Sequence, residues 1–334
     1  MAKLFEKRVG IIMSKSSYID PDLIPGLERL AQAGAGFDLS KDLDSARRAS
    51  QARDDALISQ LQVPDTIVQE IIPVISAGGH IIDLRIFRPL NAPHPLPVFY
   101  WIHGGGFVLG AARQGDAFTL RAAAALGMYA VSVEYRLAPE TPYPGPLEDC
   151  YEGLAHLIDN ADALNVDAEK IIIGGVSAGG GLCAGLGLLV RDRMDVSLLG
   201  QILLYPMLDD TNIAAAAPTL PDTLVWTRAA NLFGWQSYLG DLYGADNVPV
   251  YAAPARADDL TGLPPTYLPV GDLDLFLDEN MAYARKLMQA GVPTHFHVFP
   301  GAYHGFNGFA AEAPVSVACN AEIFDFAAKC LGQA

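Results

Sequence analysis

The pentapeptide Gly175-Val176-Ser177-Ala178-Gly179 places a serine after an apolar run and before a stretch rich in Gly and Ala. Small residues on both sides of a strand-to-helix turn let the backbone close up and leave the serine Oγ projecting above a sheet. The pattern predicts Ser177 as a nucleophile for acyl transfer. The alternative is a small residue that only caps a helix, because the motif alone also occurs by chance.

A second Gly-rich segment, His103-Gly104-Gly105-Gly106, follows an earlier apolar run. Its backbone N–H groups are not covered by side chains, so they could stabilise a developing oxyanion together with the N–H of the residue after the serine. We therefore expect an oxyanion hole at Gly104, Gly105, Gly106 and Ala178, with His103 ordering the loop. A phosphate site is not expected, because neither GxGxxG nor P-loop spacing occurs.

The base for such a serine would be one of seven histidines. His304 follows the last apolar run in a Gly-containing loop, which can bring an imidazole to the end of a strand, and we predict it as the base. His295 and His297 alternate on one strand face and could indicate a metal site, but no third ligand accompanies them, so a structural role is favoured. No metal and no cofactor is expected.

The acid that orients the histidine is expected after the preceding strand, where Val270 to Glu279 holds four carboxylates. We predict Asp274. Asp278 and Glu279 are better explained by helix capping and the helix dipole, with Asp278 as the N-cap. Asp272, directly after a turn glycine, stays open as the alternative.

These residues need a scaffold, and apolar runs alternating with helix-length segments predict a mostly parallel sheet with helices on both faces. Two antiparallel strands joined at Gly78-Gly79 come first. The expected strands are Thr66–Ala77, His80–Arg88, Val98–Ile102, Tyr129–Glu134, Lys170–Ile173, Gln201–Tyr205, Thr266–Val270 and His295–Phe299. The expected helices are Gln114–Leu126, Pro146–Asp159, Ala178–Arg193, Asp278–Ala290 and Ala321–Leu331.

Two segments fall outside this alternation and are expected to form a helical cap. One is residues 1–65, with helices starting near Asp20 and Ala46; the other is residues 209–254, which is too long for a bare loop. The core would then be residues 66–208 and 255–334. Aromatic side chains would wall a short substrate pocket, although simple packing of the cap explains them about as well: Phe107, Trp226, Phe233, Trp235 and Phe306.

The composition narrows the function further. The formal charge is −16, with 38 acidic against 22 basic side chains, so a nucleic acid or an anionic membrane is not an expected partner. Four cysteines without CxxC spacing indicate free thiols. The charged N-terminus lacks a secretory core, and no apolar run is long enough to span a bilayer. A cytoplasmic location is expected.

The whole chain resembles the bacterial-type esterases of the hormone-sensitive lipase family, in the α/β-hydrolase superfamily. The matching residues are the segments Tyr100–Phe107 and Glu134–Glu140, the serine pentapeptide, and the regions of Asp274 and His304. The resemblance implies an α/β-hydrolase fold with a sheet of about eight strands and a two-part cap. It also implies a Ser177–Asp274–His304 triad and suggests a homodimer through the last strand.

The expected activity is a serine carboxylesterase that hydrolyses short-to-medium acyl esters of small molecules through an acyl-enzyme. A lactonase or amidase could use the same residues. A ligand-binding receptor on a hydrolase scaffold is the alternative from another class, although such a receptor would be expected to lose its catalytic residues.

Overall fold

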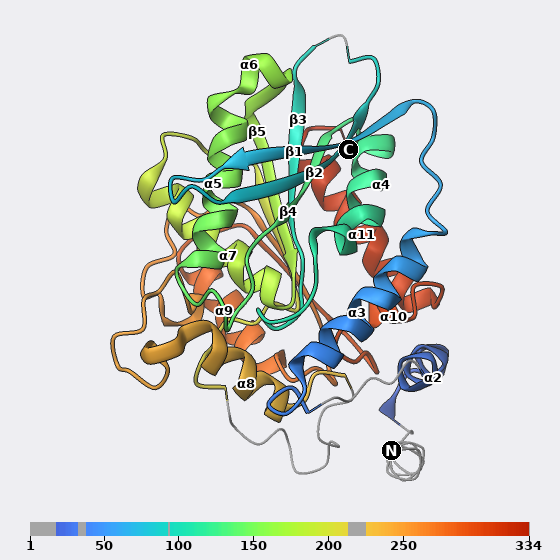
Figure 1. Ribbon diagram of the computed structural model, residues 1–334, viewed down its shortest axis with the longest axis vertical. Coiled ribbons are helices and arrows are strands. Elements are labelled where there is room, and N and C mark those ends of the chain that lie inside the picture. Colours follow the sequence, from blue (N-terminus) through green and yellow to red (C-terminus); the bar gives the residue numbers. More distant parts are fainter. Residues whose placement is uncertain (1–17, 33–37, 93, 213–224, 334) are drawn as a thin grey trace.

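A computed structural model describes residues 18–32, 38–92, 94–212 and 225–333. Within them, eight strands form one sheet in the order β1-β2-β4-β3-β5-β6-β7-β8 (Figure 1). The strands are β1 (Ile67–Ile75), β2 (Ile81–Pro89), β3 (Leu96–Ile102), β4 (Tyr129–Glu134), β5 (Val166–Val176), β6 (Gly200–Leu204), β7 (Thr266–Gly271) and β8 (Thr294–Phe299). The pairs β1–β2 and β2–β4 are antiparallel and the rest are parallel. The sequence predicted the antiparallel β1–β2 hairpin and the mostly parallel sheet.

Helices cover both faces of this sheet (Figure 1). One face carries α5 (Gly145–Asp159), α7 (Ala178–Arg193) and α9 (Leu277–Gln289); the other carries α4 (Asp116–Leu126) and α11 (Pro314–Cys330). Short helices α6 (Ala161–Leu164) and α10 (Phe306–Phe309) lie in connections. The α/β-hydrolase fold is confirmed. Two helix starts were wrong: Asp278 lies inside the first turn of α9, whose N-cap is Phe276, and α11 begins at Pro314 because proline suits a first turn.

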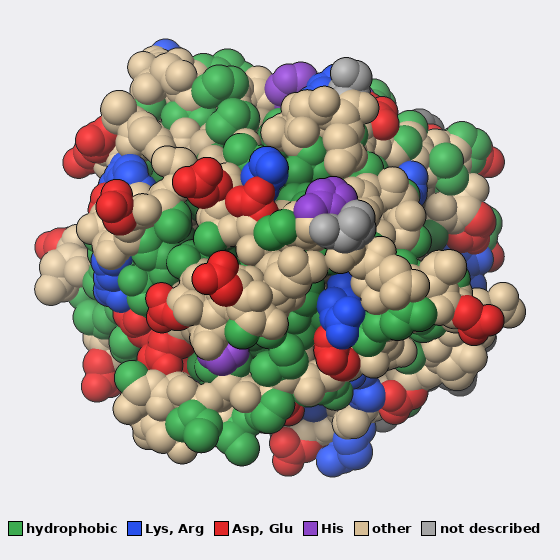
Figure 2. Space-filling view, turned by 90° about the horizontal axis from the view of Figure 1, so that it is seen from above, with side chains coloured by type: hydrophobic (Ala, Val, Ile, Leu, Met, Phe, Trp, Pro, Cys, Tyr) green, Lys and Arg blue, Asp and Glu red, His purple; other side chains and the backbone are tan. Residues whose placement is uncertain are grey.

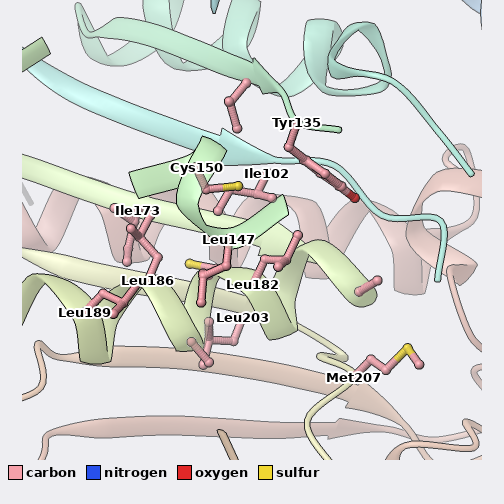
Figure 3. Packing of buried hydrophobic residues seen from close by; sticks show 14 of the residues in the cluster. Ile102, Tyr135, Leu147, Cys150, Ile173, Leu182, Leu186, Leu189, Leu203 and Met207 are labelled. Atoms are coloured by element: carbon pink, nitrogen blue, oxygen red, sulfur yellow. The ribbon is translucent and has the colours of Figure 1, made fainter. Parts of the chain in front are cut away.

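Two layers of apolar side chains hold the helices to the sheet. Along β5, Ile171 and Ile173 face the layer of α5 and α7, whereas Ile172 faces the opposite layer. Figure 3 shows part of the first layer, in which Leu182 and Leu186 of α7 pack near Leu147 of α5. All four cysteines are free thiols, as expected.

Three helices lie outside the alternating core: one packs against α10, and the other two lie against the loops that follow β3 and β4. They are α2 (Ile24–Gln32), α3 (Leu43–Ile58) and α8 (Arg228–Leu239). From α3, the Arg47 guanidinium donates to the carbonyls of Val108 and Ala138, at 2.9 Å each. From α8, Gly234 lies against the Gly106 carbonyl. The division into a core and a two-part cap stays a prediction, and these contacts agree with it.

The surface bears the acidic excess of the sequence. Acidic side chains occur across the face seen from above, among apolar and basic ones (Figure 2). In the part of the chain that the structure describes, no helix has the length and apolar character needed to cross a bilayer.

Candidate active site

Ser177 occupies the sharp turn between β5 and α7. Its backbone angles, φ 58° and ψ −122°, are costly for a residue with a side chain. Backbone hydrogen bonds to the segment of β6 and the residues after it hold Ser177 there. Its N–H donates to the Leu204 carbonyl of β6 at 2.9 Å, and its carbonyl accepts from the N–H of Met207 at 3.0 Å. A strained backbone held in this way fixes where the serine hydroxyl projects.

The glycines of the pentapeptide are required by contact distances. A Cβ on Gly175 would lie 2.2 Å from the Gly179 carbonyl oxygen, and a Cβ on Gly179 would lie 2.2 Å from the His103 carbonyl oxygen. Real Cβ atoms do not approach oxygen so closely. The start of α7 therefore packs backbone to backbone against the end of β3, which brings Ser177 next to the Gly-rich loop.

Three side chains from distant parts of the chain meet at this turn. The His304 Nε2 lies 2.9 Å from the Ser177 Oγ, and the His304 Nδ1 lies 2.8 Å from the Asp274 Oδ2. The other oxygen of Asp274 accepts from the Phe276 N–H at 3.0 Å. The hydroxyl, imidazole and carboxylate form one continuous row, with all three residues buried.

Aromatic side chains orient the imidazole. The rings of Tyr205 and Phe276 both meet His304 edge-on, with centroid separations of 4.9 Å and 5.1 Å. The Tyr205 hydroxyl donates to the Asn307 Oδ1 at 2.6 Å, which fixes this ring in turn. Sequence reasoning missed Tyr205 and Asn307, because neither belongs to a motif and their contact joins the residue after β6 to α10.

The Gly-rich loop passes directly over the serine. A Cβ on Gly104 would lie 3.3 Å from the Ser177 Cβ, and Gly105 and Gly106 have φ values of 123° and 61°. Among the described residues, the N–H groups of Gly104 and Gly105 find no acceptor. The N–H of Ala178 lies in the first turn of α7, where a helix supplies no acceptor. These donors are free to bind an oxyanion.

His103 orders this loop rather than competing as a base. Its Nδ1 lies 2.8 Å from the Gly104 carbonyl oxygen, and its ring stacks on Tyr135 at 4.1 Å. The Tyr135 hydroxyl donates to the His103 carbonyl at 2.9 Å. Burial lowers the pKa of His103 to about 4, so the ring is neutral near pH 7 and Nδ1 can donate to the carbonyl.

Two other predicted carboxylates have structural contacts. Asp272 accepts from the Gly301 N–H at 2.7 Å and so shapes the turn before His304. For Glu279 the expected capping role is wrong. Its carboxylate is buried and accepts from the N–H of Leu208 at 2.7 Å and from the Asn212 side chain at 2.5 Å. Burial raises the pKa of Glu279, and these donors oppose that effect.

A second Ser-His-Asp row lies away from this site. The Ser76 Oγ is 2.7 Å from the His80 Nδ1, and the His80 Nε2 is 2.8 Å from the Asp149 Oδ1. Here the carboxylate is already paired with the Arg136 guanidinium at 2.7 and 2.8 Å. Ser76 belongs to a hairpin turn rather than a strand-to-helix turn. The row ties the β1–β2 hairpin to α5.

The predicted pocket residues separate into two groups. Phe107 stacks on Tyr238 at 4.1 Å and packs against Trp235, while the Trp226 ring covers Gly106. Phe233 of α8 is half-buried in the same layer. Phe306 instead packs in the opposite layer, near Tyr205 and Phe299. In the first group, Phe107 follows the Gly-rich loop in the chain and Trp226 covers it; the role of the group in substrate binding stays a prediction.

The strand histidines have structural partners. The His297 Nδ1 lies 2.8 Å from Glu322 and its ring stacks on Phe299, while His295 meets the edge of Phe326. Residues 18–32, 38–92, 94–212 and 225–333 contain no group of three or more side chains able to hold a metal ion.

Comparison with known proteins places this geometry in a family. Residues 99–308 match the model of a family described as alpha/beta hydrolase fold. The chain belongs to this family. Esterase LipI of Mycobacterium tuberculosis is 33% identical over 302 residues, covering 89% of this chain and 91% of LipI. These matches confirm the prediction that the chain is a hydrolase of the α/β-hydrolase superfamily.

Solved structures agree with this membership. A bacterial heroin esterase is 39% identical with a TM-score of 0.88, over 94% of this chain and 98% of that protein. An esterase from the hyperthermophilic archaeon Pyrobaculum calidifontis is 30% identical with a TM-score of 0.81. The match covers 95% of this chain and 100% of that esterase. The relatives are named as esterases, and the chain spans nearly their whole length.

Proposed function

We propose that this protein is a serine carboxylesterase that hydrolyses short-to-medium acyl esters of small molecules. The observation that carries the proposal is the row of Ser177, His304 and Asp274 with contacts of 2.9 and 2.8 Å. In this mechanism the Nε2 of His304 takes the hydroxyl proton as Ser177 attacks the ester carbonyl. Asp274 holds the imidazole in the required tautomer and stabilises the imidazolium.

The tetrahedral oxyanion is stabilised by backbone N–H groups of Gly104, Gly105 and Ala178, with Gly106 shaping the loop. His304 then protonates the departing alkoxide, which leaves as the alcohol. The acyl group stays on Ser177. Water, deprotonated by the same imidazole, attacks this acyl-enzyme and releases the carboxylic acid. Loss of one oxyanion donor would raise the barrier by about 3 kcal/mol.

The short-to-medium range is inferred from the aromatic side chains around the loop. Phe107 packs against Trp235 and the Trp226 ring covers Gly106, so we expect these side chains to limit the length of the acyl chain. A series of p-nitrophenyl esters from acetate to palmitate is expected to peak at the short-to-medium end. Preference for long-chain emulsions would contradict this inference.

The activity is tested with a panel of esters, lactones and amides on the wild type and on Ser177→Ala. The proposal expects ester hydrolysis in the wild type and a loss of roughly four decades or more in the variant. Faster turnover of lactones or amides would favour the alternative enzyme with the same residues. Binding without turnover would favour a receptor on a hydrolase scaffold.

A further inference from the structure

A chain of polar contacts links the loop of the acid to the loop of the oxyanion hole through α8. Its members are Glu279, Asn212, Asn231 and Trp226, which we call the cap latch. The latch begins in the first turn of α9, shortly after Asp274, and ends on Gly106. None of its polar residues was predicted to have this role.

The first half of the latch anchors the chain that leaves β6. The buried carboxylate of Glu279 accepts from the N–H groups of Leu208 and Asp209, at 2.7 and 3.4 Å. Its other oxygen accepts from the Asn212 side-chain amide at 2.5 Å. The same amide donates to the Leu275 carbonyl, next to the acid Asp274, at 3.2 Å. Asn212 is therefore tied to the acid loop at two points.

The second half reaches the oxyanion loop. The Asn231 side chain of α8 donates to the Asn212 carbonyl at 3.1 Å and accepts from the Trp226 indole N–H at 3.2 Å. The Trp226 ring lies so close to Gly106 that a Cβ there would be 2.1 Å from its Cη2. Gly234 approaches from the same helix, where a Cβ would lie 2.7 Å from the Gly106 carbonyl oxygen.

We propose that Asn231 is a positioning residue that holds Trp226 on Gly106 and thereby fixes the oxyanion loop over Ser177. Asn231 is buried and uses both ends of its amide, so it connects the Trp226 ring to the chain that leaves β6. The inference rests on the proposed function, since it concerns how the oxyanion loop is positioned for ester hydrolysis. Because the rate of such reactions depends strongly on the alignment of the oxyanion donors, a small displacement of the loop reduces turnover.

The test variant is Asn231→Leu, with Gln236→Leu as the matched control. Both changes replace an amide side chain by leucine on α8, but Gln236 is exposed. For p-nitrophenyl acetate we expect kcat to fall about tenfold in Asn231→Leu with KM nearly unchanged. The control is expected to keep the wild-type kcat.

Acrylamide quenching of tryptophan fluorescence gives a second readout. The chain has three tryptophans, all buried in the folded protein. Release of Trp226 in Asn231→Leu is expected to increase quenching while the thermal transition persists. Unchanged kcat or unchanged quenching would overturn the proposal. The quenching does not need activity, so an inactive wild type would refute the proposed function without deciding this one.

A double-mutant cycle tests whether the loss in Asn231→Leu acts through the contact with Trp226 or through a general disturbance of the structure. Trp226→Phe keeps a ring at Gly106 but removes the N–H that Asn231 accepts. If the two residues act through one contact, the double variant is expected to lose no more than about twofold beyond Asn231→Leu. Fold-losses that multiply would overturn the proposal. Should Asn231→Leu fail to fold, Asn231→Ala takes its place, since it removes the acceptor for Trp226 and the donor to Asn212 without adding a branched apolar side chain.

Discussion

Replacing Gly179 by alanine examines how the serine turn is positioned. The new Cβ would lie 2.2 Å from the His103 carbonyl oxygen and 2.3 Å from the Ile102 carbonyl oxygen. Both contacts are with backbone, so no flexible side chain can move aside. The start of α7 must shift away from the end of β3 by roughly an ångström to reach an ordinary contact distance.

The shift has two measurable consequences. Overpacking of this kind lowers the free energy of unfolding by about 1–3 kcal/mol. It also separates the Ser177 hydroxyl from the Gly-rich loop, and a misplacement of this size reduces kcat by up to about a hundredfold. The activity loss is expected to exceed what partial unfolding explains, since the variant stays folded at 25 °C if its stability is ordinary.

The assay combines urea unfolding with steady-state hydrolysis of a short p-nitrophenyl ester. Gly308→Ala is the matched control, because a Cβ there meets nothing within 4 Å. We expect wild-type stability and activity for Gly308→Ala and losses in both for Gly179→Ala. If Gly179→Ala kept the wild-type kcat and midpoint, the close approach of α7 to β3 would not be what positions the serine.

Three further predictions concern residues outside the Ser177–His304–Asp274 row. The pKa of His103 is about 4 in the folded state, below its unfolded value, so the folded state binds fewer protons and the free energy of unfolding falls as pH drops from about 6.5 towards 4. Urea unfolding at pH 7 and 5 is expected to show about 2 kcal/mol of this loss, absent from His103→Asn. Arg47→Ala leaves the Val108 and Ala138 carbonyls without their donor and is expected to lower the free energy of unfolding by about 2 kcal/mol, measured in the same assay. EDTA is expected to leave ester hydrolysis unchanged; inactivation would reopen the metal alternative for His295 and His297.

The sequence predicted the strands and the serine turn well, because both follow from local patterns. Buried parallel strands appear as short apolar runs. The glycines at 175 and 179 indicate that backbone segments approach too closely there for any residue with a side chain. The limits of α9 and α11 were less accurate, since a helix start depends on how the preceding loop packs.

Contacts between distant segments could not be predicted in the same way. Glu279 sits in the first turn of α9, where an acidic side chain suits the helix dipole, yet its carboxylate turns inward to bind the chain after β6. Asn231 and Tyr205 likewise have partners far away in sequence. Such roles arise only when the fold brings the segments together, and no spacing along the chain records them.

The nucleophile is tested most directly by covalent labelling with a serine-directed organophosphonate, followed by intact mass and peptide mapping. A single adduct is expected on the peptide that contains Ser177, and no adduct is expected in Ser177→Ala. An adduct on Ser76, which also has a histidine and an aspartate beside it, or no adduct on the wild type, would contradict the assignment.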